Sequence, residues 1–398
     1  MDDAIKKPPL IMLVLITAIG PLALNIFVPS MPGLQVEFGI TYVVAQLTLS
    51  LYLLALAFSQ PIYGPMADRF GRRPVALFGL TVMLVASLVC VFAPNIEVLI
   101  FGRALQAFGA GAGQVVARAM LRDSHDTDKS ASAMGYLVMM MVVAPMIAPT
   151  IGGFVDAWFG WRAIFVCVAV FTGLIVLAAV PYLKETRPGD ATSLGFASQI
   201  FGSLTLLKNP IFSLNALQVS FSTGAFFAFL GGAPFIFVTI YGLAPEQFGI
   251  YFMPISAFFM VGNFITGKLA VRLGPLQLVR VGTVLPLLGI ALLVGLELGG
   301  MMTPINFIAS MCFIALGNGM NMPNGSMLAI SADPQRAGAA SGLLGFIQMM
   351  LAAALSTLVS AFLDDSALPL IIIMALCALI AFFIVWLPGG ARAGSGPQ

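Results

Sequence analysis

Long apolar runs, separated by short polar or charged breaks, cover almost the whole chain. Of 398 residues, 60% are hydrophobic and only 9% are charged, whereas a soluble domain carries about 25% charged residues. A soluble fold of this length would therefore lack the polar surface that water requires. Because one bilayer crossing takes roughly 20 apolar residues, the runs predict an all-α membrane protein.

The breaks define twelve predicted transmembrane helices, six on each side of a longer polar segment. Within residues 1–183 the predicted spans are Leu10–Met31, Val43–Gly64, Val75–Phe92, Ile96–Ala117, Ala133–Val155 and Ala163–Tyr182. Within residues 211–398 they are Ile211–Phe237, Phe248–Ala270, Leu278–Leu298, Pro304–Gly325, Ala337–Phe362 and Leu368–Leu387. Residues 184–210 are predicted to be a cytoplasmic linker between two six-helix halves.

The charges of the connecting segments predict the orientation. With the N-terminus in the cytoplasm, 16 of the 18 basic residues fall on cytoplasmic segments, and Arg103 and Arg162 are the exceptions. This distribution follows the positive-inside rule. We therefore expect a multi-pass protein of the bacterial inner membrane with both termini in the cytoplasm.

The two halves resemble each other in one short motif. Gly64–Gly71 and Gly267–Gly274 share four residues at a constant offset, and the approaches to spans five and eleven are also similar. Repeated six-span units are typical of secondary transporters, whose substrate site lies between the units.

The composition disfavours several other functions. Cys90, Cys167, Cys312 and Cys377 lie in apolar runs, and the single histidine, His125, lies in a charged loop. These residues predict no metal site, no cofactor and no Ser-His-Asp triad. A net charge of +2 gives no electrostatic basis for binding nucleic acid.

The segment Gly64–Arg73 closely resembles the signature loop of the major facilitator superfamily, G-x-L-A-D-R-x-G-R-K. We expect Gly64 and Gly71 to permit a close backbone approach and a tight turn. The resemblance implies that Asp68 and Arg72, with Arg69 in the same loop, lock the outward-facing state through charge contacts. The alternative is a basic cluster that only sets topology.

Two further segments resemble motifs of this superfamily. Arg103–Gly111 is similar to R-x-x-Q-G; Arg103 and Gln106 share a helix face, which suits a cavity lining, although Arg103 is also placed to snorkel to the interface. Ala144–Gly153 is similar to the exporters' motif G-x-x-x-G-P-x-x-G-G, with alanine in place of its two leading glycines. Pro149, Gly152 and Gly153 are therefore predicted to act in gating, or else to form an ordinary kinked packing helix.

Segments of the N-terminal half look like the branch of drug exporters that includes the bicyclomycin, chloramphenicol and florfenicol exporters. They are Pro21–Pro32, Gln46–Tyr52, Ala104–Ala107 and Glu185–Pro188. We expect Asn25, Gln46 and Tyr52 to line the substrate cavity. Asn25 stands where the branch carries an acidic residue that takes up a proton. None of the 16 acidic residues lies in the middle of a predicted span, so coupling uses an edge carboxylate such as Asp68 or Asp156, or differs from proton antiport.

Span ten carries Asn318, Asn321 and Asn324 on one face, interleaved with Gly317, Gly319 and Pro323. Buried amides need partners, so the stripe either joins helices or lines the cavity. We place Asn318 and Asn321 in the predicted cavity.

The leading hypothesis is a monomeric efflux transporter for small, mostly neutral amphiphiles, working by rocking of the two halves. The alternative is a transporter of a metabolite, such as a sugar or amino-acid derivative, in which Arg103 clamps an anion. A membrane-embedded enzyme lacks acids and histidine at depth, and a sensor lacks a soluble signalling domain.

Overall fold

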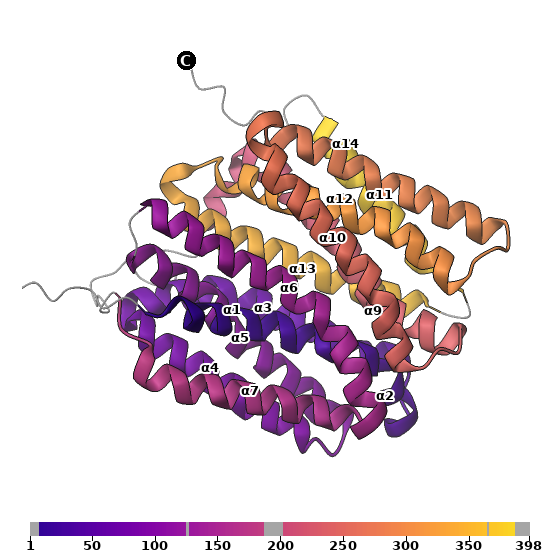
Figure 1. Ribbon diagram of the computed structural model, residues 1–398, viewed down its shortest axis with the longest axis horizontal. Helices are drawn as coiled ribbons and strands as arrows, with labels where there is room; N and C mark the ends of the chain where they lie inside the picture. The colour runs from indigo at the N-terminus through magenta and orange to yellow at the C-terminus, as the bar shows by residue number, and fades with distance from the viewer. Residues whose placement is uncertain (1–7, 125–126, 187–201, 364–365, 387–398) are drawn as a thin grey trace, which may run out of the picture.

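Two helical bundles lie side by side in the computed structural model (Figure 1). The structure describes residues 8–124, 127–186, 202–363 and 366–386, and at 122, 124 and 127–142 it describes the backbone alone. The helices up to α7, drawn from indigo to magenta, form one bundle. The helices from α9 onward, drawn from red to yellow, form the second.

The helices of the N-terminal half are α1 (Leu10–Ile26), α2 (Met31–Phe38), α3 (Tyr42–Phe70), α4 (Arg72–Val91), α5 (Ile96–Ser124), α6 (Thr127–Phe159) and α7 (Trp161–Tyr182). Those of the C-terminal half are α9 (Pro210–Phe235), α10 (Pro245–Leu273), α11 (Pro275–Leu298), α12 (Pro304–Ile330), α13 (Ala337–Phe362) and α14 (Leu368–Trp386). Each predicted span coincides with one of these helices, except that the first extends over α1 to the start of α2.

In the described residues, 10 helical segments are long and apolar enough to cross a membrane, and α6 adds the shorter apolar segment Val143–Phe159. The remaining crossing is α5, 29 residues long, whose hydropathy is lowered by Arg103, Gln106 and Gln114. Together these helices account for the twelve predicted crossings. The domain limits at 183 and 211 stay a prediction, because residues 187–201 of the linker, like His125, lie outside the described residues.

The first predicted span, Leu10–Met31, lies in one helical stretch, Leu10–Phe38, whose backbone changes form near Ile26. The helix α1 ends at Ile26, a 3₁₀ turn η1 (Val28–Ser30) follows, and α2 continues to Phe38. Pro29 lies within that turn and has no backbone N–H to continue an α-helix. The helix α9 also ends in a turn of another helical type, because the π-helical turn η3 (Ile236–Ile240) follows Phe235.

The repeated motif marks equivalent corners of the two halves. Gly71 (φ 95°, ψ 154°) separates α3 from α4, and Gly274 (φ 77°, ψ 154°) separates α10 from α11. These angles strain any residue with a Cβ atom, so the tight turn predicted at Gly71 is confirmed. The close approach predicted at Gly64 is absent here, because no neighbouring atom lies within 4 Å of where its Cβ would be.

The halves meet along two seams, where α3 packs against α13 and α6 packs against α10. Glycines let the backbones approach on the second seam. A Cβ at Gly153 would lie 2.7 Å from the carbonyl oxygen of Pro245, and a Cβ at Gly249 would lie 2.7 Å from Cα of Thr150. One residue earlier, a Cβ at Gly152 would overlap the carbonyl oxygen of Ile26 on α1.

We therefore expect Gly152→Ala to lower the free energy of unfolding by about 1–3 kcal/mol, because the added methyl group separates α6 from α1. Thermal unfolding of the purified protein in detergent measures the loss. The matched control is Gly173→Ala on α7, whose new methyl group meets only Leu84 Cδ1 at 3.8 Å. Equal melting temperatures for the two variants would contradict this packing.

Candidate functional site

Arg103 lies in the interior of the N-terminal half, with 0% of its side chain exposed. Its Nη1 donates to the carbonyl oxygen of Ala23 at 3.0 Å and to Oε1 of Gln106 at 2.6 Å. Gln106 Nε2 in turn donates to Oγ of Ser87 at 2.8 Å. The chain of bonds joins α1, α5 and α4, and the snorkelling alternative for Arg103 is wrong.

The end of α1 supplies an acceptor for this guanidinium. The N–H of Phe27 bonds to the carbonyl of Asn25 rather than to that of Ala23, as the chain turns into η1. The oxygen of Ala23 is therefore free to accept from Arg103. Cations are favoured at a helix C-terminus, where the carbonyl dipoles point outward.

Three aromatic rings surround the same guanidinium. Its Cζ lies 4.3 Å from the ring centre of Tyr52, 5.1 Å from that of Phe27 and 5.8 Å from that of Phe165. The hydroxyl of Tyr52 donates to the carbonyl of Gly20 at 3.0 Å. Nε and Nη2 of Arg103 have no hydrogen-bond partner, so ring faces replace the acceptors that water would supply.

Gln46 lies where the halves meet. Its Nε2 donates to Oγ of Ser356 on α13, and its Oε1 is buried without a partner. Asn25 lies two residues after Ala23 and so on nearly the opposite side of α1. Its Nδ2 donates to the carbonyl of Pro21 at 2.8 Å, and its Oδ1 is buried without a partner. Two amide oxygens are thus left as acceptors without donors.

Among the residues whose side chains the structure describes, hydrogen bonds join the halves at one end, which we call the closed end. There the hydroxyl of Tyr42 donates to the carbonyl of Gly231 at 2.6 Å, and Thr150 Oγ1 donates to that of Gly249 at 2.8 Å. The Gln46–Ser356 bond and a longer bond of 3.4 Å from Ser256 to the carbonyl of Met146 complete the set between described residues. Pro149 and Gly153 flank these contacts on α6.

The signature loop lies at the other end, which we call the loop end. Arg72 is buried, and its Nη2 and Nε contact Asp68 Oδ1 at 2.8 Å and Asp123 Oδ2 at 3.0 Å. Glu185 accepts at 3.0 Å from the backbone N–H groups of both Arg72 and Arg73, at the start of α4. Arg69 is exposed and lies 5.6 Å from the ring centre of Phe70.

Asp68 and Arg72 thus pair within the N-terminal half, and their predicted locking role stays a prediction. The sequence reasoning missed Asp123 and gave Glu185 no role here. A carboxylate at the N-terminus of α4 is favoured by the helix dipole, but no local pattern brings residue 185 to residue 72.

The asparagines of the α12 stripe differ in their contacts, and their place in a substrate cavity stays a prediction. Asn321 joins helices: it accepts from Gln218 Nε2 at 2.8 Å and donates to Ser222 Oγ at 2.6 Å. Asn324 donates to the carbonyl of Met320 at 2.6 Å.

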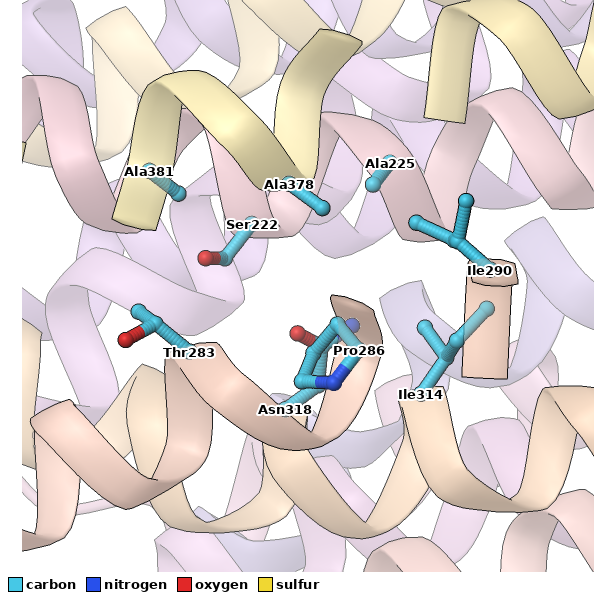
Figure 2. A pocket seen from close by; sticks show the side chains of 9 residues that line it. All are labelled: Ser222, Ala225, Thr283, Pro286, Ile290, Ile314, Asn318, Ala378 and Ala381. Atoms are coloured by element: carbon cyan, nitrogen blue, oxygen red, sulfur yellow. The ribbon is translucent and has the colours of Figure 1, made fainter. Parts of the chain in front are cut away.

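Asn318 faces a cavity inside the C-terminal half (Figure 2). The cavity, about 10 Å³, is enclosed by α9, α11, α12 and α14 and lined also by Ser222, Thr283 and Pro286. Nδ2 of Asn318 is buried there without a partner. The space suits about one water molecule, not a drug-sized substrate. Among the described residues, no group of His, Cys, Asp and Glu is placed to hold a metal ion.

The buried network predicts that Arg103→Ala lowers the free energy of unfolding by about 3 kcal/mol, because it leaves buried polar partners unpaired. Arg103→Met retains much of the volume without the charge, and we expect a smaller loss. Thermal unfolding measures both. The control is Arg336→Ala, whose exposed pair with Asp333 is worth about 0–1 kcal/mol. A loss for Arg103→Ala no larger than the control's would contradict this role.

Comparisons with known proteins agree with the resemblances in the sequence. The chain is 32% identical over 379 residues to an uncharacterized MFS-type transporter of Bacillus subtilis, with 93% of each chain covered. It is 29% identical to multidrug resistance protein D of Escherichia coli, with 96% of each covered. It is 26% identical to a bicyclomycin resistance protein homolog of Haemophilus influenzae, with 92% of each covered.

The fold is also that of a solved bacterial homolog of the human lysosomal transporter Spinster. The TM-score is 0.71 at 17% identity, covering 95% of this chain and 93% of that one. Residues 13–357 match the family model of the Major Facilitator Superfamily. The chain is therefore a multi-span membrane transporter of small molecules rather than an enzyme, and it belongs to the Major Facilitator Superfamily.

Proposed function

We propose that this transporter exports small, mostly neutral amphiphiles from bacteria by alternating access. The observation that carries the proposal is that the cross-half hydrogen bonds between described residues gather at the closed end. Opening that end requires breaking these hydrogen bonds and separating apolar contacts between the halves, such as that of Tyr42 with Phe235. The relatives named for multidrug and bicyclomycin resistance support export of drugs.

We derive the substrate preference from two buried amide groups of the N-terminal half. Asn25 Oδ1 and Gln46 Oε1 are buried acceptors without donors, and a hydroxyl or amide N–H of a substrate would satisfy them. Neither group carries a charge, which favours neutral molecules over ions. The contacts of Arg103 are all made within the N-terminal half, which disfavours its use as a clamp for an anionic metabolite.

We propose that the loop end faces the cytoplasm of a bacterial inner membrane, with both termini on that side. The positive-inside distribution supports this placement, and the closed end then faces outward. The units that rock are residues 1–183 and 211–398, connected by the linker 184–210, and the working form is a monomer.

We do not propose proton coupling through the middle of the first span, because the amide of Asn25 does not titrate. Asp68 and Asp156 lie near opposite span edges and remain the candidate carboxylates. In the outward-open state we expect the loop ends of both halves to approach, so that Asp68 and Arg72 hold the signature loop against the C-terminal half.

Removing one bond at the closed end is expected to favour opening there. Tyr42→Phe deletes the bond to Gly231 and costs about 1 kcal/mol, which is about a fivefold change in the equilibrium. The readout is the rate at which a maleimide labels Ser30→Cys, a position that is 1% exposed, in protein whose native cysteines are alanine. The rate should rise about fivefold in Tyr42→Phe and stay unchanged in Tyr182→Phe, an exposed tyrosine at the loop end. An unchanged labelling rate in Tyr42→Phe would show that this hydrogen bond does not hold the closed end shut.

The transport function is tested in a host that lacks its own efflux pumps. Expression should raise resistance to neutral amphiphilic antibiotics, and Asp68→Asn should abolish the gain while membrane insertion stays normal. In proteoliposomes, a pH gradient should accelerate drug flux more in Asn25→Asp than in the wild type, because the variant restores a titratable group. Unchanged resistance to a broad panel, with no drug flux in liposomes, would rule out the proposed export.

A further inference from the structure

An incompletely paired arginine lies at the loop end of the C-terminal half. Arg280, in the second turn of α11, is half-buried. Its Cζ lies 5.1 Å from the ring centre of Trp386, the last residue of α14. Its Nε is buried without a hydrogen-bond partner. The guanidinium is held against a ring, and among the described residues its Nε has no acceptor.

Each half has an ion pair at the loop end. In the N-terminal half, Arg72 contacts Asp68 and Asp123. In the C-terminal half, Arg336 pairs with Asp333. Within the part of the chain that the structure describes, Lys268, Arg272 and Arg280 form no ion pair. These three cations lie on the helices joined at Gly274, near one corner of the bundle.

The surface around these cations is apolar and exposed. Val271 is 94% exposed, and Phe264, whose ring centre lies 4.6 Å from Nζ of Lys268, is 62% exposed. Leu273, Val281 and Trp386 are also exposed. An exposed apolar surface beside these cations suits a partner that combines a negative charge with an acyl chain.

We propose that Arg280 and Trp386 form a binding site for the headgroup of an anionic phospholipid. The guanidinium donates to the phosphate oxygens, for which its planar fork of N–H groups is suited. Lys268 and Arg272 add to the positive potential that attracts the headgroup. The indole of Trp386 lies at the interfacial depth that tryptophan prefers and orients the guanidinium. This inference does not depend on the substrate or direction of transport.

The test uses the purified full-length protein and native mass spectrometry. Phosphatidylglycerol and phosphatidylcholine with identical acyl chains are titrated in separate experiments. We expect the wild type to bind one phosphatidylglycerol about tenfold more tightly than phosphatidylcholine, and Arg280→Gln to lose that preference. The matched control, Lys208→Gln, removes another basic residue of the same half, in the 3₁₀ turn before α9, and should keep it.

Two further experiments address a variant that fails to fold and the question whether the bound phosphate belongs to a lipid or to a free anion. If Arg280→Gln does not fold, the double variant Lys268→Gln/Arg272→Gln should reduce the preference several-fold, and a full preference there would overturn the proposal. Millimolar inorganic phosphate should not displace the bound lipid; displacement would assign the site to a free anion instead. A preference for phosphatidylglycerol that persists in folded Arg280→Gln would also overturn the proposal.

Discussion

The N-terminal half is organised around a buried guanidinium that has no ion pair with any described carboxylate. Burying a charge costs several kcal/mol unless it is paired and hydrogen-bonded. The cost of burying the charge of Arg103 is offset by the carbonyl of Ala23, by Gln106 and by three ring faces. These groups come from different helices, so Arg103 is stabilised only when the bundle is assembled. The same contacts join α1, α3, α4, α5 and α7, and we propose that this half moves as a rigid body.

The motion of two rigid halves depends on the contacts along the seam between them. The seams contain hydrogen bonds near the closed end and close backbone contacts at Gly153 and Gly249. At the loop end, the charges of the signature loop are satisfied inside the N-terminal half by Asp68, Asp123 and Glu185. A rocking motion requires the two ends to differ. At the closed end the halves are joined across the seam, whereas at the loop end the charges of the signature loop are paired within the N-terminal half.

Local patterns in the sequence predicted the helices, the corner at Gly71 and the Asp68–Arg72 pair, because each depends on residues close in the chain. The change of helix form after Ile26 was not predictable, since Pro21 lies inside the continuous helix α1 whereas Pro29 lies in a 3₁₀ turn. The partners of Arg72 from residues 123 and 185 depend on packing of distant helices. The asparagine stripe also required the structure: its spacing places Asn318 and Asn321 on one face, yet Asn321 joins α9 and Asn318 faces an internal cavity.

The central claim is that the two halves move as rigid bodies about the seam. The most direct measurement is the distance between paired spin labels at both ends of the full-length protein. One pair joins Val36 to Leu298 at the closed end, and the other joins Phe70 to Val271 at the loop end, all exposed positions. With a transported drug added, the account predicts a population in which the first distance lengthens and the second shortens together. A change at one end without the opposite change at the other would contradict it.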